Sequence, residues 1–335
     1  MTKFIILLYN VLTNNILECF LMIYEIDKIK KIVDVARMYY EQNLTQNEIA
    51  KALSISRPSI SKMLAEAKNL GIVKITITSP LEQNEELLKN IKETFNLKGG
   101  IIVHGAASEK VNNAFITNES AVYIMDKLTK ANKIGLGWGK MINSIVKRIS
   151  ETSSVKTSGV ICPLLGNSVT PYEEYHPDSL VRELGEKMGL KPFYIYSPTF
   201  FESKEEFEGF LNLENQKIIN NLWNSLDIAI LNIDNHPSVP DFATASRFGE
   251  SLHIKKIIGH MISYYYNIDG EILDSSSDYT NHISLADLKN TKTVIGVCSA
   301  DTNVKSVIGA LKTGLITHLI IDDELAGKVL EAISK

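Results

Sequence analysis

Short apolar segments alternate with amphipathic stretches through the last two-thirds of the chain, and this alternation constrains the fold more than any other feature. The apolar segments are short enough to be buried strands. Strands that alternate with helical stretches form a mostly parallel sheet with helices on both faces. We therefore predict an α/β domain over residues 99–335, with strands at Ile101–Val103, Ile134–Leu136, Val160–Leu165, Phe193–Tyr196, Ile228–Ile233, Val294–Cys298 and Leu319–Asp322.

The length and composition are those of a globular protein with two domains. The chain has 335 residues, of which 44% are hydrophobic and 22% charged. These values exclude a disordered, collagenous or multi-span membrane protein. The three cysteines lie far apart and form no CxxC pair. We therefore expect reduced, buried thiols and a cytoplasmic location.

The first 24 residues contain two apolar runs with a polar cluster between them. They show neither the basic start nor the cleavage pattern of a secretory signal, and the polar cluster interrupts the roughly 20 apolar residues that a spanning helix needs. We interpret residues 1–24 as an extension peripheral to the fold, with Met22 as a hypothetical true start. A helix packed on the body or on a partner subunit, and a membrane anchor, are the alternatives.

A helix-turn-helix is predicted between Leu44 and Ala67, inside a winged domain that spans residues 25–79. Thr45 and Glu48 have the spacing of a capping box, which begins one helix. Ser54 and Ile55 form the turn. Ser56 is expected to cap the helix that follows, which has Pro in its first turn, where a missing N–H is not needed. The inner faces of the two helices are expected to bury Ile49, Ala50, Leu53, Ile60, Met63, Leu64 and Ala67.

The outward face of the second helix suits double-stranded DNA. Arg and Lys pair with guanine edges or phosphates, and short hydroxyl side chains let the backbone approach the groove. Residues 25–78 carry a net charge of +3 (9 Lys/Arg, 6 Asp/Glu), against −7 for the rest of the chain. Segment 71–77 would form a wing against the sugar-phosphate backbone. An αα-corner without a nucleic-acid role is the alternative. The predicted DNA contacts are Thr45, Gln46, Ser56, Arg57, Ser59, Ser61, Lys62 and Lys74.

Residues 80–98 are predicted to form a linker helix whose apolar stripe can bury against the body or a second subunit. Beyond it, ligands of a parallel sheet are expected at the carboxyl ends of the strands, near helix N-termini. The turn Gly135–Lys140 has three glycines between a strand and a helix. It is a candidate ligand loop, although glycines at such a turn also serve tight packing.

Several motifs on both sides of residue 98 carry a resemblance to a known family. They include Leu44–Ala50, Ser56–Lys62, Gly137–Gly139 and Leu319–Asp322. In them the chain resembles the SorC-type sugar-responsive transcriptional regulators, which are related to the DeoR group. The resemblance implies a winged helix-turn-helix joined to an effector domain of the NagB/RpiA/CoA-transferase-like fold. Members of this family bind phosphorylated sugars and commonly form tetramers on operators.

The chain also departs from the family pattern. Met141 stands where the family usually has Thr, Asn303 replaces the usual lysine, and Asp234 and His260 stand in two other family motifs. Losing a lysine and a hydroxyl while gaining a carboxylate weakens anion binding. We therefore expect a ligand other than a sugar phosphate, or no tight ligand. The effector-site residues that the resemblance implies are Gly137, Gly139, Lys140, Met141, Gly166, Asp234, His260, Ala300, Asn303 and Asp322.

These observations predict a sequence-specific transcriptional regulator that acts as a homodimer or homotetramer. Its partners would be a double-stranded DNA operator and a small effector, a sugar or sugar phosphate, with no cofactor, metal or membrane. A regulator with a vestigial pocket, controlled by a protein partner or by oligomerisation, is one alternative. A sugar-phosphate isomerase-like enzyme is the other, and it is disfavoured because the histidines and carboxylates form no catalytic or metal-ligand motif.

Overall fold

The computed structural model describes residues 26–73, 80–153, 155–167, 175–237, 248–273 and 279–334. The chain divides into two compact units, Met1–Thr78 and Ser79–Lys335, which are described separately below. Residues 1–24, which we interpreted as an extension, and Lys74 of the predicted wing lie outside the described residues.

Residues 26–73 of the first unit contain three helical segments. Residues 26–40 are helical, and α2 (Gln46–Leu53) and α3 (Arg57–Asn69) follow. Their buried faces meet in two small clusters, one of which joins Val35, Ile49, Ile60 and Leu64. Leu53 was expected in this core but is 41% exposed, because it lies in the last turn of an eight-residue helix whose buried contact is made by Ile49.

The predicted caps of both helices are present. The backbone N–H of Glu48 donates to the Thr45 hydroxyl, and the Glu48 carboxylate accepts from the Thr45 N–H at 2.8 Å. The hydrogen bonds that the Glu48 carboxylate accepts from the N–H and the hydroxyl of Thr45 lower the pKa of Glu48. In the turn between the helices Ser54 adopts a left-handed conformation with φ 55°, and the Ser56 hydroxyl then accepts from the Ser59 N–H. The helix-turn-helix is therefore specified by local hydrogen bonds that the sequence already shows.

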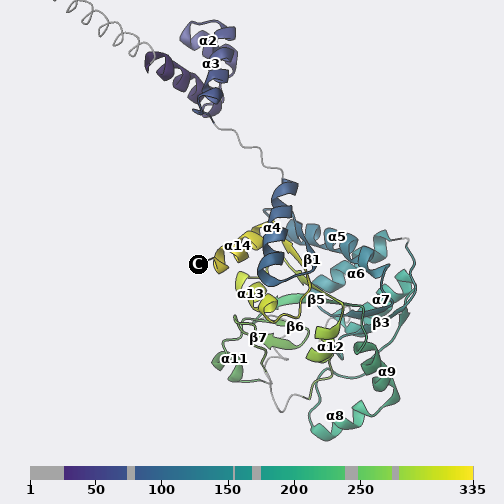
Figure 1. The fold of residues 1–335 in the computed structure, drawn as a ribbon. Helices are drawn as coiled ribbons and strands as arrows, with labels where there is room; N and C mark the ends of the chain where they lie inside the picture. Colours follow the sequence, from purple (N-terminus) through teal and green to yellow (C-terminus); the bar gives the residue numbers. More distant parts are fainter. Residues whose placement is uncertain are drawn as a thin grey trace, which may run out of the picture. The chain divides into compact units, whose positions relative to one another are not determined.

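The second unit is a parallel sheet with helices packed against it (Figure 1), as predicted. In its described part, the parallel strands lie in the order β1-β9-β8-β5-β2-β3-β4. A short antiparallel hairpin, β6 (Gly259–Met261) and β7 (Tyr264–Tyr266), extends from the end of β5. The parallel strands are β1 (Gly99–Val103), β2 (Lys133–Leu136), β3 (Val160–Pro163), β4 (Lys191–Pro192), β5 (Ile228–Asn235), β8 (Thr293–Cys298) and β9 (His318–Asp322).

The helices pack in two series. The first is α5 (Glu109–Leu128), α6 (Lys140–Thr152) and α7 (Pro177–Met188), and the second is α4 (Pro80–Phe95), α14 (Asp323–Ile333) and α13 (Val304–Lys312). Right-handed crossovers between parallel strands place the first series on one face of the sheet and α13 on the other. The other helices in the described part of this unit are α8 (Lys204–Leu211), α9 (Glu214–Trp223), α11 (Ser251–Ile254) and α12 (Leu285–Asn290).

Two predicted strands are wrong in extent. The third strand ends at Pro163 rather than Leu165, and the fourth is Lys191–Pro192 rather than Phe193–Tyr196. The cause of the second difference is the Asp178 carboxylate, which accepts the backbone N–H groups of Ile195 and Tyr196. Tyr196 also adopts a left-handed conformation with φ 55°. Ile195 and Tyr196 are therefore held by a side chain, whereas the Phe193 N–H still donates to the Ile161 backbone oxygen at 2.8 Å.

The strands and both helix series share one core. Helix α4, the predicted linker helix, contributes Ile91, which is fully buried in that core, so its apolar stripe packs on the body. Cys162 and Cys298 are buried free thiols, and burial raises the pKa of Cys162 to about 12. None of the helices in the described ranges is long and apolar enough to span a membrane.

Candidate functional site

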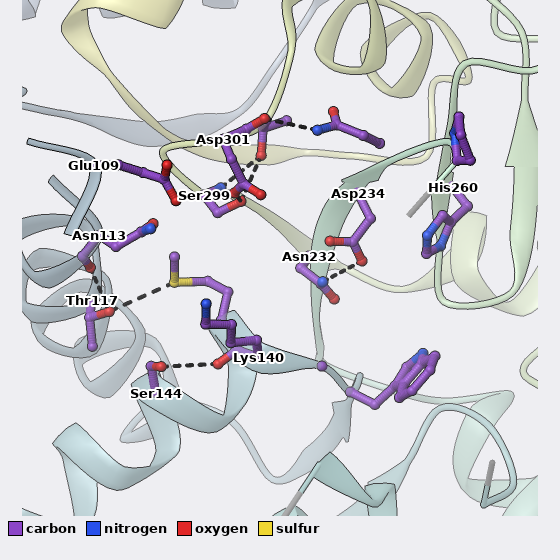
Figure 2. A pocket seen from close by; sticks show the side chains of 16 residues that line it. Glu109, Asn113, Thr117, Lys140, Ser144, Asn232, Asp234, His260, Ser299 and Asp301 are labelled. Atoms are coloured by element: carbon purple, nitrogen blue, oxygen red, sulfur yellow. Dashed lines mark hydrogen bonds between the residues drawn. The ribbon is translucent and has the colours of Figure 1, made fainter. Parts of the chain in front are cut away.

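A cavity of about 300 Å³ opens at the carboxyl ends of three adjacent strands, β2, β5 and β8. This is the edge of the sheet where ligands were expected. Figure 2 shows side chains of α5 on one side of the cavity and those of β5 and β6 on the other. The lining residues are Glu109, Asn113, Thr117, Trp138, Gly139, Lys140, Met141, Ser144, Asn232, Asp234, Asn235, Pro237, His260, Ser299, Asp301 and Thr302.

The glycine-rich turn between β2 and α6 forms one wall of the cavity. Gly139 has φ 109°, which favours glycine, and a side chain there would meet the Asn232 amide at 3.1 Å. The indole N–H of Trp138 donates to the backbone oxygen of Ile262, which fixes the ring against the β6–β7 hairpin. Tight packing and ligand contact were alternative roles for the glycines of this turn. Gly139 both packs tightly and lines the cavity.

Helix α5 forms a second wall, which the sequence did not indicate. Glu109, Asn113 and Thr117 are spaced four residues apart and share one helix face. The Asn113 side-chain oxygen accepts from the backbone N–H of Ala300. The Thr117 hydroxyl lies 3.8 Å from the Met141 sulfur, so α5 supplies a hydroxyl beside the position where the family usually has one. The polar stripe at this spacing was the signal that could have identified these residues.

The ends of β5 and β8 form the third wall. Asp234 of β5 and His260 of β6 are paired across the two strands, and the Asn232 amide donates to the Asp234 carboxylate. Asn235 holds the loop after β8, because its amide donates to the Asp301 backbone oxygen and accepts from the Asn303 N–H, at 2.8 and 2.9 Å. The Ser299 hydroxyl donates to the Asp301 carboxylate.

Charged side chains of both signs line the cavity. In the described part of its wall, these are the carboxylates of Glu109, Asp234 and Asp301 and the ammonium group of Lys140. Among the residues that the structure describes, no group of three or more His, Cys, Asp or Glu side chains is arranged to hold a metal ion. The arrangement can therefore bind a polar ligand through hydrogen bonds and charge, with Trp138 as an aromatic surface.

Half of the predicted effector residues line the cavity, namely Gly139, Lys140, Met141, Asp234 and His260. The others do not. Gly137 and Gly166 pack tightly against the backbones of Ile230 and Pro198, and Ala300 is held through its N–H by Asn113. Asn303 and Asp322 cap α13 and α14, where each side chain accepts a backbone N–H.

The predicted DNA contacts occupy the first unit. Ser56, Arg57, Ser61 and Lys62 are exposed at and beyond the start of α3, and Ser59 is half-buried. Gln46 and Thr45, at the start of α2, line a shallow hollow that also contains Arg57 and Tyr40. The Thr45 and Ser56 hydroxyls also cap their own helices.

Comparison with known proteins identifies the family. Residues 79–331 match the family model described as "Putative sugar-binding domain". The chain is 27% identical to the sorbitol operon regulator of Klebsiella pneumoniae over 314 residues, which cover 91% of this chain and 99% of that protein. It is 25% identical to the deoxyribonucleoside regulator of Bacillus subtilis, with 89% and 96% covered.

A solved structure agrees with these matches. The full-length sorbitol operon regulator of Klebsiella pneumoniae superposes with a TM-score of 0.68 at 25% identity, covering 91% of this chain and 99% of that one. The fold and the resemblance predicted from the sequence are therefore confirmed: the chain belongs to the sugar-binding domain family of SorC-type transcriptional regulators.

Proposed function

We propose that this regulator binds an operator through α3 and senses a small carbohydrate-like metabolite in the cavity at the ends of β2, β5 and β8. The observation that carries the proposal is the position of the cavity. It lies inside the segment that matches the sugar-binding domain family, at the sheet edge where parallel α/β folds bind ligands. The protein would act in the cytoplasm, without a cofactor.

On the DNA side, α3 would act as the recognition helix. Its first turn presents the exposed Arg57 guanidinium, and Lys62 is exposed about one and a half turns further along. A guanidinium can donate two hydrogen bonds to one guanine edge. A homodimer, or a homotetramer made of two dimers, would place two such helices in successive major grooves, about 34–36 Å apart.

A regulator with a vestigial pocket is the second candidate function. It is favoured by Met141 and Asn303, two positions at which the chain departs from the family pattern. Met141 brings no hydroxyl to the cavity, and Asn303 caps α13 instead of lining the wall. Such a protein would bind its operator without responding to any small metabolite. We propose no enzymatic activity, and turnover of a sugar phosphate by the purified chain would contradict that.

The test uses the full chain and fragments of its own chromosome. We expect one or a few fragments to be retained at moderate ionic strength, and a carbohydrate-like metabolite to change their affinity. Arg57→Ala should lose the preference, whereas Lys217→Ala, which removes an exposed lysine of α9, should keep it. Equal binding of all fragments by the wild-type protein would overturn the proposal. A preference that no metabolite alters would support the vestigial pocket.

A further inference from the structure

The shallow hollow of the first unit contains polar side chains to which no role has yet been given. It has a volume of about 550 Å³ and lies between the end of helix 26–40, the start of α2 and the first residue of α3. Thr45, Gln46 and Arg57 were predicted to contact DNA, and the other lining residues were not. The described lining residues are Tyr39, Tyr40, Asn43, Leu44, Thr45, Gln46, Asn47 and Arg57.

The side chains of this hollow are rich in hydrogen-bond donors. Two phenols, three carboxamides and a guanidinium line it, and no carboxylate occurs among its described lining residues. Arg57 carries the one charge of this set, which is positive. Phenol, carboxamide and guanidinium groups can all donate to an acceptor that has no hydrogen of its own. The hollow therefore fits an anion with several acceptor oxygens.

Local hydrogen bonds occupy one of these donors and leave two others available. The Thr45 hydroxyl donates to the Glu48 carboxylate and accepts from the Glu48 N–H, so Thr45 caps α2 and holds that carboxylate. Tyr40 is 36% exposed, and Asn47 is exposed as well. Within residues 26–73 neither the Tyr40 hydroxyl nor the Asn47 amide is engaged in a hydrogen bond. Both can therefore donate to a ligand.

Packing fixes the positions of these two donors. The Tyr39 ring packs against the core of the unit, and the Tyr40 ring meets it edge-on with centroids 4.9 Å apart. Beyond the helix, Asn43 adopts a left-handed conformation with φ 55°, and the Leu44 N–H donates back to a helix carbonyl at 3.0 Å. Asn47 lies in the first turn of α2. The rim of the hollow is therefore formed before a ligand arrives.

The place of the hollow in the helix-turn-helix indicates what the anion is. In this motif the first residues of the second helix contact base edges in the major groove, while the first helix crosses the DNA backbone. Arg57 begins α3, and the hollow beside it extends to the start of α2. It would therefore lie against the strand that borders the groove. The phosphates of that strand commonly accept hydrogen bonds from Tyr and Asn side chains.

We propose that the hollow receives one backbone phosphate of the bound duplex, and that the Tyr40 hydroxyl and the Asn47 amide donate to its oxygens. Both are positioning residues, which fix the register of α3 in the groove and select no base. This inference rests on the proposed function, because it adds a contact to the same DNA-binding unit.

Two variants separate this contact from a structural role. Tyr40→Phe removes the hydroxyl and keeps the ring. Asn47→Asp places a carboxylate in the first turn of α2, where the helix dipole favours it, so stability should not fall although the carboxylate repels a phosphate. The measurement is fluorescence anisotropy of the full-length protein with a chromosomal fragment that it retains and with a scrambled duplex. Tyr40→Phe should bind both about three- to tenfold more weakly, and Asn47→Asp more weakly still.

The matched control is Asn90→Asp, which makes the same change in net charge at an exposed position of α4. It should bind both duplexes like the wild-type protein. Urea unfolding measures the stability of each variant, and Tyr40→Phe carries the test alone if Asn47→Asp fails to fold. Wild-type affinity of Tyr40→Phe for both duplexes would overturn the inference. So would a loss confined to the retained fragment, since a phosphate contact is independent of sequence.

A scan of the DNA backbone locates the phosphate. In the retained fragment, single phosphates are replaced one at a time by neutral methylphosphonates. At one position of the recognised site the replacement should weaken binding of the wild-type protein by a larger factor than binding of Tyr40→Phe, because the hydroxyl and that phosphate then form a coupled pair in a double-mutant cycle. Equal factors for the two proteins at every position would contradict the contact.

Failure of this inference is distinguishable from failure of the proposed function. If the chain prefers one fragment and Tyr40→Phe binds like the wild type, the operator function holds and the phosphate contact is wrong. If all fragments bind equally but Tyr40→Phe and Asn47→Asp both weaken that binding, the phosphate contact holds and the operator function is wrong.

Discussion

At the residue scale, Arg57 is the side chain that we expect to recognise the base sequence of the operator. Its side chain is exposed at the first position of α3, and loss of a bidentate guanine contact costs about 1–3 kcal/mol of discrimination. Arg57→Ala should therefore abolish selective binding, with an operator affinity about 10- to 100-fold lower while non-specific affinity changes little. Fluorescence anisotropy with operator and scrambled duplexes measures both affinities. Unchanged operator affinity would show that α3 does not read the bases.

Lys74 provides the complementary prediction, although it lies outside the described residues. A wing lysine that contacts phosphate weakens binding to every sequence when it is removed, and lowers the salt slope by about one unit. Lys74→Ala should therefore lower operator and scrambled-duplex affinity by the same factor, in a series of measurements at increasing salt concentration. A selective loss on the operator alone would instead place Lys74 at a base.

His318 predicts how stability depends on pH. Its side chain is 9% exposed at the start of β9, and burial, with Lys127, Lys98 and Lys92 nearby, lowers its pKa from 6.5 to about 4. Between these values the unfolded chain binds the proton and the folded chain does not. The free energy of unfolding should therefore fall on acidification from pH 6.5 to 4, by at most about 1.4 kcal/mol per pH unit.

Replacing His318 tests this prediction. The ring nitrogen contacts the Thr317 hydroxyl at 2.9 Å, and His318→Asn keeps a polar group there without a titration in this range. Urea unfolding at pH 7 and pH 5 should show a smaller loss for His318→Asn than for the wild-type protein. His253→Asn, at an exposed histidine of α11, should behave like the wild type. An equal loss in all three proteins would rule out His318 as the cause.

At the element scale, Asn303 shows how a family position has acquired another role. Its side chain accepts the Ser306 N–H at 2.8 Å and begins α13. Loss of such a cap costs about 1 kcal/mol. Asn303→Ala should therefore lower the free energy of unfolding by about that amount in urea titrations, whereas Asn303→Asp, which also caps, should stay within a few tenths. If both variants lose the same stability, the cap does not contribute.

The same elements show what the sequence could predict. Helix caps, such as those at Thr45 and Ser56, depend on residues within one turn, so the sequence predicts them correctly. The face of α5 that carries Asn113 faces the loop after β8, about 187 positions away in the chain. Such a contact depends on strand order. Asp178 likewise removes a predicted strand through hydrogen bonds made 17 and 18 residues away.

At the scale of the whole molecule, effector binding and operator binding should be coupled. The cavity lies in Ser79–Lys335 and the exposed face of α3 in Met1–Thr78, so we expect an effector in the cavity to change DNA affinity by favouring one state of the assembly. In a homodimer or homotetramer, that state would set the spacing or association of the recognition helices. Sedimentation of the chain, free and on its operator, with and without effector, measures its oligomeric state. A chain that stays monomeric on its operator would exclude control through the assembly.

Such coupling is reciprocal, and reciprocity is the sharpest whole-molecule test. If the effector changes operator affinity by a given factor, the operator must change effector affinity by the same factor, about 5- to 150-fold for a coupling of 1–3 kcal/mol. Titrating effector into the free protein and into the protein–operator complex gives one factor, and titrating operator with and without effector gives the other. Equal factors indicate one linked equilibrium. A change in operator affinity with no matching change at the cavity would mean that the effector acts on the DNA-binding unit directly.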